Sequence, residues 1–209
     1  MNRKLLISGL EELKIDFDDL ALDRFETYLD EIMLFNPSLK LTGYKSEEDN
    51  IIRNFLDSAA LWKIFDETDG EIIDVGSGAG FPGLVLAILF PQRKITLLDR
   101  MTRRTAFLFS ASKRLLLDNV NILNCDIKEV KRRFDIITSR AFHPTADVID
   151  DLVRMLDEGG SMVFYKGKRD AVEKEMKDVE NMGLVFDIKS IKVPFLNEER
   201  NALIIRRND

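Results

Sequence analysis

The spacing of apolar residues changes near Gly70 and divides the chain into two regions. Before this point, apolar residues recur at intervals of three and four, as in LALDRFETYLDEI, which predicts amphipathic helices. We expect the stretch NPSLKLTGY to break this helical region, because it contains Pro37 and Gly43. Residues 1–69 are therefore predicted to form a helical extension.

Beyond Gly70, short runs of β-type residues alternate with helical stretches. This alternation predicts an α/β fold with crossover connections and a mostly parallel, seven-stranded sheet covered on both faces. Only the sequence PFLNEER separates the last two runs, so we expect them to pair as an antiparallel hairpin. The predicted strands cover residues 72–75, 95–98, 120–123, 134–138, 161–165, 185–193 and 202–205. The predicted helices cover residues 81–90, 102–117, 145–156 and 170–182.

The composition indicates one substantial hydrophobic core and no membrane segment. The chain has 209 residues, 45% of them hydrophobic, and no apolar run near the ~20 residues that cross a bilayer. Its N-terminus contains acidic residues where a signal peptide would be cleaved, so we expect a cytoplasmic protein. Cys125 and His143 are single residues of their kinds, which argues against disulfides, a zinc cluster and a Cys-His catalytic pair. No metal site is expected.

Charge is distributed unevenly along the chain. The formal net charge of −6 argues at first against a nucleic-acid partner, because phosphates bind Lys and Arg. However, residues 1–70 hold 8 basic and 16 acidic residues, whereas the segment from Arg100 to Arg140 holds ten basic and four acidic ones. We therefore expect a basic surface in the second region, with the carboxylates of the first region directed away from bound phosphates.

A glycine-rich turn follows the first predicted strand. Gly76, Gly78 and Gly80 lie between the strand IIDV and the helix LVLAIL, where α/β sheets bind nucleotide-like groups. The spacing G-x-G-x-G differs from the dinucleotide pattern G-x-G-x-x-G, and no G-K-[ST] follows, so a cofactor without a pyrophosphate fits better than NAD. Asp99 ends the second strand, nineteen residues after Gly80, where its carboxylate can accept both ribose hydroxyls.

The end of the third predicted strand offers groups for an adenine ring. Asp126 can meet the adenine edge there, while Ile127 and Lys128 supply backbone groups and apolar contact. Together with the glycine turn, these features fit S-adenosylmethionine. The alternative is purely structural: the glycines permit a tight turn and Asp99 caps the following helix.

Several motifs in fixed order resemble one enzyme family. With DVGSGAGFPGLVLAILFP, LLDRMTRRTAFL, FDIITSRAF, YKG and EERNALIIRR, the chain resembles the RsmG (GidB) family of 16S ribosomal RNA guanine-N7 methyltransferases. The stretches RNFLDSAAL and NPSLKLTGY extend the resemblance into the helical region. It implies a class I S-adenosylmethionine-dependent methyltransferase fold, Rossmann-like, over residues 70–209, preceded by the helical extension. It also implies methylation of N7 of one guanine, position 527 in the customary ribosomal numbering, in 16S rRNA of the small ribosomal subunit. We expect a monomer.

The resemblance also implies functions for individual residues. It places cofactor contacts at Gly76, Phe81, Ile127, Lys128 and Arg140, and our predicted cofactor site adds Asp74, Gly78, Gly80, Asp99 and Asp126. It places basic side chains that face the RNA at Arg103, Arg104, Arg140, Lys166 and Arg200. This chain differs from the family pattern in having Asn54 where His is common, Phe35 for Trp, Lys40 for Asn and Arg103 for Lys. Some relatives have Arg at the position of Asp126.

The implied chemistry requires no catalytic acid or base. Guanine N7 carries an in-plane lone pair and no proton, so methyl transfer to it depends on positioning and electrostatics. Arg140 is the candidate residue for this role, and it can contact guanine O6, a phosphate or the methionine carboxylate. The structural alternative for Arg140 is an ion pair with Asp74 or Asp135. Arg103 has an alternative too, an ion pair with Asp99.

Cys125 and His143 bear on alternative reactions, and the fold itself allows alternative functions. Cytosine C5 methylation needs a reactive cysteine, but Asp126 follows Cys125 and should raise the pKa of its thiol. His143, which precedes a proline, is expected to be a loop histidine. The alternative functions are methylation of a small molecule or protein on the same fold, and a non-catalytic nucleotide-binding module.

Overall fold

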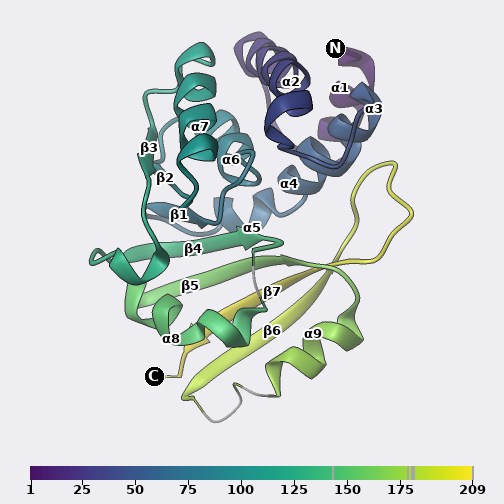
Figure 1. Cartoon of the computed structure of the whole chain (residues 1–209). Helices are drawn as coiled ribbons and strands as arrows, with labels where there is room; N and C mark the ends of the chain where they lie inside the picture. The colour runs from purple at the N-terminus through teal and green to yellow at the C-terminus, as the bar shows by residue number, and fades with distance from the viewer. Residues whose placement is uncertain (143, 178, 180–181, 209) are drawn as a thin grey trace.

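One seven-stranded sheet forms the centre of the protein, with strand order β3-β2-β1-β4-β5-β7-β6. The computed structural model describes residues 1–142, 144–177, 179 and 182–208. Strands β1 to β5 pair in parallel, whereas β7 is antiparallel to both β5 and β6 (Figure 1). The sheet and its antiparallel terminal hairpin are therefore confirmed. The strands are β1 (Ile72–Val75), β2 (Ile95–Leu98), β3 (Val120–Leu123), β4 (Phe134–Arg140), β5 (Leu156–Lys166), β6 (Leu184–Ile191) and β7 (Arg200–Arg207).

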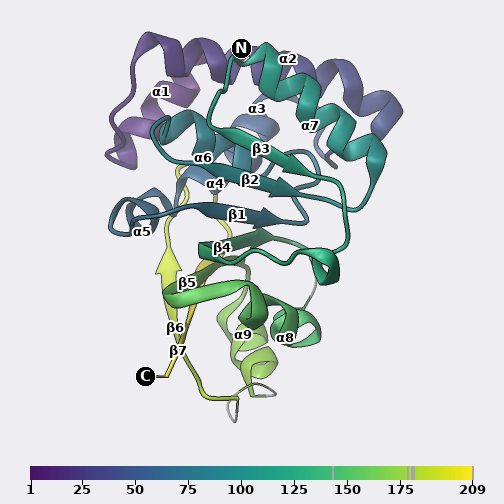
Figure 2. The same ribbon diagram turned by 90° about the vertical axis from the view of Figure 1, so that its left-hand side faces the viewer.

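Helices cover both faces of this sheet and form two separate hydrophobic clusters. One cluster joins α1, α2, α6 and α7 to the sheet, and the other joins α8 and α9 to the opposite face (Figure 2). The N-terminal helices are α1 (Arg3–Glu12), α2 (Asp19–Leu39), α3 (Glu47–Asn50), the π-helix η1 (Ile51–Leu56), α4 (Asp57–Ala59) and α5 (Trp62–Asp66). The later ones are α6 (Gly83–Leu89), α7 (Thr102–Arg114), the 3-10 turn η2 (Ile127–Glu129), α8 (Thr145–Met155) and α9 (Arg169–Met176).

The N-terminal helices share their core with the glycine turn. Phe25, Tyr28 and Phe55 are fully buried, and the Tyr28 and Phe81 rings lie 5.3 Å apart between centroids. The Tyr28 hydroxyl also donates a 2.6 Å hydrogen bond to the carbonyl of Ala79, inside the turn. Burial of several aromatic side chains contributes about 1.5–3 kcal/mol each, so this contact holds the helical segment firmly against the turn.

Several boundaries differ from the prediction; strand β5, for example, begins at Leu156, five residues before the predicted 161. Helix α2 continues through Pro37 to Leu39, because a proline in the last turn removes one backbone hydrogen bond without preventing the turn. The helix ends instead at Lys40, which adopts a left-handed conformation with φ of 51°. Strand β4 extends two residues beyond the prediction, so Arg140 is its last residue. Helix α9 ends at Met176, short of the predicted 182; residues 178, 180 and 181 lie outside the described residues.

Among the described residues, no helix is both long enough and apolar enough to cross a bilayer.

Candidate active site

The three glycines of the turn are required for different reasons. Gly76, with φ of +73°, leaves no room for a side chain, because a Cβ there would lie 2.1 Å from the Phe142 ring. Gly80 has φ of +97°, and a Cβ there would lie 2.6 Å from Leu84 and 2.7 Å from the Tyr28 hydroxyl. Gly78 has φ of +58°, but a Cβ there would meet no described atom nearer than 3.8 Å. Packing thus explains the first and third glycines, whereas the space beside the second is open.

Asp74 lies beneath the turn and is not among the lining residues of the two cavities described below. Its side chain is fully buried, and Oδ2 accepts a 3.0 Å hydrogen bond from the backbone N–H of Gly83, near the start of α6. Its other oxygen, Oδ1, has no hydrogen-bond partner among the described residues. Burial raises the pKa of Asp74 from 3.8 to about 7, against the lowering effect of the Gly83 hydrogen bond. The structure thus gives Asp74 a role in fixing the turn.

Asp99 connects the turn to the second strand. Its Oδ2 accepts a 3.0 Å hydrogen bond from Gly78 N–H, and its Oδ1 accepts one of 2.9 Å from Met101 N–H. The basic residue paired with Asp99 is Arg104, at 3.4 Å, and not Arg103 as the alternative proposed. Asp99 is only 4% exposed, so its carboxylate is fixed at the edge of the neighbouring cavity.

A cavity of about 440 Å³ opens beside these groups. Asp126, Ile127 and Lys128 line it, as does Cys125. Asp126 caps η2, because its Oδ1 accepts from Lys128 N–H at 3.1 Å and its own N–H donates to Glu129. Burial, then the charges of Glu129 and Asp126, raise the pKa of the Cys125 thiol, so it is a poor nucleophile. We call this space the turn cavity; its full lining is Val75, Gly76, Leu98, Asp99, Arg100, Met101, Arg104, Cys125, Asp126, Ile127, Lys128, Phe142, Asp147, Val148 and Asp151.

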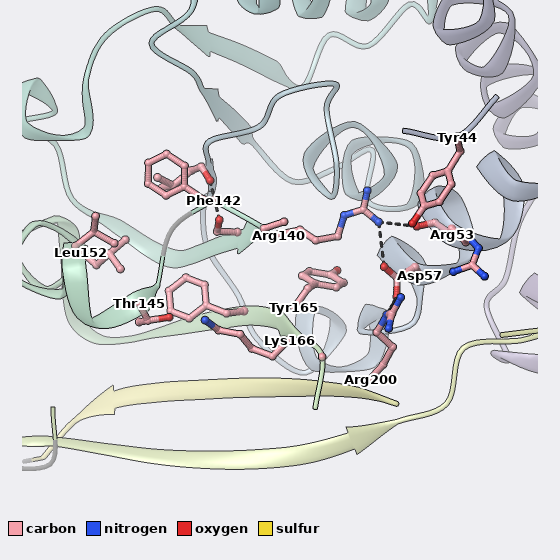
Figure 3. A pocket seen from close by; sticks show the side chains of 16 residues that line it. Tyr44, Arg53, Asp57, Arg140, Phe142, Thr145, Leu152, Tyr165, Lys166 and Arg200 are labelled. Atoms are coloured by element: carbon pink, nitrogen blue, oxygen red, sulfur yellow. Dashed lines mark hydrogen bonds and ion pairs between the residues drawn. The ribbon is translucent and has the colours of Figure 1, made fainter. Parts of the chain in front are cut away.

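A second cavity, of about 460 Å³, adjoins the first (Figure 3). Val75, Phe142 and Val148 line both, so the two spaces meet around the Phe142 ring. We call the second space the arginine cavity. Its remaining lining residues come from the N-terminal segment, β4, β5, α8 and β7: Tyr44, Arg53, Asp57, Ser139, Arg140, Ala141, Thr145, Leu152, Phe164, Tyr165, Lys166, Gly167 and Arg200.

The N-terminal segment holds Arg140 in one orientation. Its Nη1 donates to the Arg53 carbonyl at 2.8 Å and to Asp57 Oδ2 at 3.0 Å, and its Nη2 donates to Asn54 Oδ1 at 2.7 Å. The guanidinium also lies 4.9 Å from the centre of the Phe81 ring. The predicted alternative of an ion pair with Asp74 or Asp135 is therefore wrong, because Asp57 provides the partner.

Asp57 is shared by two arginines. Its Oδ1 accepts from Arg200 Nε at 3.1 Å, while its Oδ2 accepts from Arg140. Its side chain is only 8% exposed, so the one negative charge lies between two positive ones. Arg200 also binds Glu198 at 3.0 Å, and Glu198 binds Arg53 at 2.5 Å. The expectation that N-terminal carboxylates avoid this cleft therefore fails for Asp57, which is fully paired with cations.

The predicted RNA-facing residues occupy three different places. Arg140, Lys166 and Arg200 come together around the arginine cavity. Lys166 binds Glu175 at 2.8 Å; burial would raise the pKa of Glu175, but the hydrogen bonds from Lys166 and Thr145 N–H lower it.

The other two basic residues predicted to face RNA, Arg103 and Arg104, lie nearer the turn cavity. Arg104 lines the turn cavity, whereas Arg103 is exposed and makes no ion pair with any described residue. Phe81 is buried in the aromatic cluster under Arg140, and His143 lies outside the described residues.

Several lining residues were not predicted from the sequence. Tyr44, Arg53 and Asp57 belong to the acidic N-terminal segment, of which only the carboxylates were expected to point away from bound phosphates. One local signal was present: Asn54 and Asp57 are polar residues inside the apolar run IIRNFLDSAA, where an unpaired polar group is costly. Phe142 follows β4 in a loop, and no sequence pattern marks it as the residue shared by both cavities.

The seven-stranded sheet with its glycine turn is the fold of class I methyltransferases. Among solved structures, a ribosomal protein L11 methylase from Lactobacillus delbrueckii subsp. bulgaricus is similar, with a TM-score of 0.60 and 16% identity, covering 74% of this chain and 78% of that one. A precorrin-6y C5,15-methyltransferase from Geobacter metallireducens has a TM-score of 0.57 and 16% identity, covering 80% and 91%. At such identities the likeness concerns the fold.

Sequence comparison then identifies the family. The family model described as rRNA small subunit methyltransferase G matches residues 21–204. A "Ribosomal RNA small subunit methyltransferase G" of Francisella tularensis subsp. tularensis is 36% identical over 199 residues, which is 95% of this chain and 94% of that protein. A protein of the same name from Acetivibrio thermocellus is 31% identical over 213 residues, covering 98% and 88%. The chain belongs to the rRNA small subunit methyltransferase G family, as its motifs indicated.

Proposed function

We propose that this protein transfers the methyl group of S-adenosylmethionine to N7 of one guanine in 16S rRNA, at the position customarily numbered 527. The observation that carries the proposal is the pair of adjoining cavities that meet at Phe142. One is bordered by the glycine turn and acidic groups, and the other by cations. A methyl donor in the turn cavity and an RNA acceptor in the arginine cavity can thus approach one another beside the Phe142 ring.

The residues of the turn cavity fit the proposed cofactor. Asp99 directly follows β2 beside the turn and carries the carboxylate that a ribose would require. Ile127 is 6% exposed and, with Leu98, gives the cavity apolar surface for an adenine. The open space beside Gly78 allows close approach to the backbone. When bound, the cofactor supplies an electrophilic methyl group on a sulfonium.

The arginine cavity fits an acceptor that has no proton to lose. Among its described lining residues, Asp57 is the one carboxylate, and two arginines occupy its oxygens. Tyr165 is partly buried, desolvation raises its pKa well above the ordinary value for tyrosine, and its hydroxyl donates to the Ser58 carbonyl at 2.6 Å. Neither group can act readily as a general base. Guanine N7 needs none, so the protein's task is orientation and electrostatic stabilisation.

The cations around this cavity favour RNA over the alternative acceptors. The arginine cavity is lined by four cationic side chains, those of Arg53, Arg140, Lys166 and Arg200. Arg103 is also exposed, and it precedes Arg104, which lines the turn cavity. Phosphate groups bind Lys and Arg strongly, and single-stranded RNA carries one per nucleotide. A small molecule or protein acceptor, or a binding module without turnover, does not require this concentration of cations beside a methyl donor.

The test is a methyl-transfer assay with purified protein and radiolabelled S-adenosylmethionine. We expect incorporation into unmethylated small subunits or 16S rRNA, and none into free nucleosides, ribosomal proteins or metabolite extracts. Incorporation into a small molecule alone would refute the proposal. Comparing assembled subunits with free 16S rRNA identifies the preferred form. The proposal includes a monomer that acts in the cytoplasm, and light scattering measures the mass in solution.

A further inference from the structure

The arginine cavity has an aromatic wall that the proposed reaction has not used. Tyr44 lies in the loop between α2 and α3 and is partly exposed at the edge of this cavity. Figure 3 shows Tyr44 and Phe142 at opposite sides of the space, with Arg140 between them. Tyr44 thus borders the cavity far from the point where the turn cavity joins it.

Polar side chains anchor the backbone of Tyr44. The Tyr44 carbonyl accepts hydrogen bonds from Asn36 Nδ2 at 3.2 Å and from Asn50 Nδ2 at 3.4 Å. Its N–H donates to Thr42 Oγ1 at 3.2 Å. Asn50 is fully buried, so the loop is attached to the protein core although it contains no regular structure. Because the backbone that carries the ring is anchored, less of the loop must be ordered when a ligand binds.

A cation lies against the same ring. The Arg53 guanidinium carbon is 5.6 Å from the Tyr44 ring centre, and ion pairs with Glu198 and Asp49 hold it there. The hydrogen bond to Glu198 is the main reason that the pKa of Arg53 is raised. An aromatic face beside a guanidinium, bordering a cationic cavity, is the combination that single-stranded nucleic acids use for base stacking.

We propose that Tyr44, supported by Arg53, provides a stacking surface for an RNA base adjacent to the methylated guanine. The inference rests on the proposed function and adds a second base to it. The target guanine lies at the Phe142 end, next to the methyl donor, and the neighbouring base lies at the Tyr44 end. Stacking tolerates any base, so this contact contributes affinity and register and does not select a sequence.

The test compares three variants in steady-state methylation of small subunits isolated from cells that lack this enzyme. Tyr44→Leu should raise KM for the subunits about 10-fold with kcat little changed, since a lost stack weakens binding. Tyr44→Phe keeps the ring and should match the wild type. The matched control is Phe109→Leu: Phe109 is 59% exposed on α7, has Lys113 Nζ 5.8 Å from its ring centre, and lines neither cavity.

Calorimetry with S-adenosylmethionine separates the possible failures. All three variants should bind the cofactor as tightly as the wild type does. Equal KM values for Tyr44→Leu and Phe109→Leu would overturn the inference, and so would a Tyr44→Phe defect as large as that of Tyr44→Leu. A loss of cofactor affinity that accounts for the Tyr44→Leu defect would also overturn it, because the residue would then support the fold. If the wild type methylates no subunits, the proposed function itself fails.

Discussion

Removing the charge of Asp74 should change how the stability of the protein depends on pH. This carboxyl group is fully buried, and its pKa rises from 3.8 to about 7 on folding. The folded state therefore retains a proton that the unfolded state releases between these two values, so stability falls as pH rises through this window. A pKa difference of about 3 corresponds to about 4 kcal/mol in total.

The perturbation is Asp74→Asn, and the quantity to follow is its free energy of unfolding minus that of the wild type. Asn cannot ionise, so this difference should become about 3 kcal/mol more favourable to the variant between pH 5 and pH 8. Taking the difference cancels all other titrating groups that the substitution leaves unchanged. The pH-independent cost of placing an amide where Oδ1 has no hydrogen-bond partner among the described residues shifts this difference equally at every pH, so it does not affect the change between pH 5 and pH 8.

Urea unfolding followed by circular dichroism measures both proteins at each pH. Asp135→Asn is a suitable comparison, because Asp135 also accepts a backbone hydrogen bond, from Glu71 N–H at 2.7 Å, but is only partly buried. Stability curves for Asp74→Asn and wild type that run parallel from pH 5 to pH 8 would refute the reasoning. Asp74 would then be ionised in the folded protein, and the burial argument would be wrong.

Three further predictions concern the turn and the arginine cavity. Gly78→Ala should cost only about 1 kcal/mol of stability but lower S-adenosylmethionine affinity at least ~10-fold by calorimetry, because its methyl enters open space beside the turn. Asp57→Asn should lower the free energy of unfolding, measured in urea, by about 3 kcal/mol, because two arginines lose their shared negative charge. The control Asp49→Asn removes an exposed carboxylate paired with Arg53 and should lower it by less than ~1 kcal/mol. Asn54→His should make methyl transfer pH-dependent, with activity rising near pH 6–7, because an imidazolium repels the Arg140 guanidinium that Asn54 now holds. Unchanged affinity, equal destabilisation by both aspartate changes, or a flat pH profile would contradict the respective prediction.

The sheet could be predicted because its strands are buried on both faces. IIDV and ITLL are mostly apolar, with Asp74 and Thr96 as exceptions, and every position of both strands is buried in the parallel part of the sheet. The same logic located Asp99 near the cofactor side, since the carboxyl ends of parallel strands share one edge. The helix break predicted at Pro37 is wrong, because burial of one face of α2 stabilises the helix by more than the proline destabilises it.

The arginine cavity depends on contacts that no local pattern contains. Arg140 and Asp57 are 83 residues apart in sequence, and Arg200 and Asp57 are 143 apart. Their meeting follows from how the N-terminal helices pack on the sheet, through the shared aromatic core. The choice of Arg104 over Arg103 as the partner of Asp99 depends on the phase of α7, which is set by its start at Thr102.

Mapping modified nucleotides in 16S rRNA tests the central claim most directly. Small subunits from cells lacking this protein are incubated with the purified enzyme and S-adenosylmethionine, and nuclease fragments of the RNA are analysed by mass spectrometry. The account predicts one new 7-methylguanine, absent before incubation and diminished when Gly78→Ala replaces the wild type at an S-adenosylmethionine concentration that does not saturate the variant. A methyl group on another atom or another base, or methylation that survives Gly78→Ala undiminished, would contradict it.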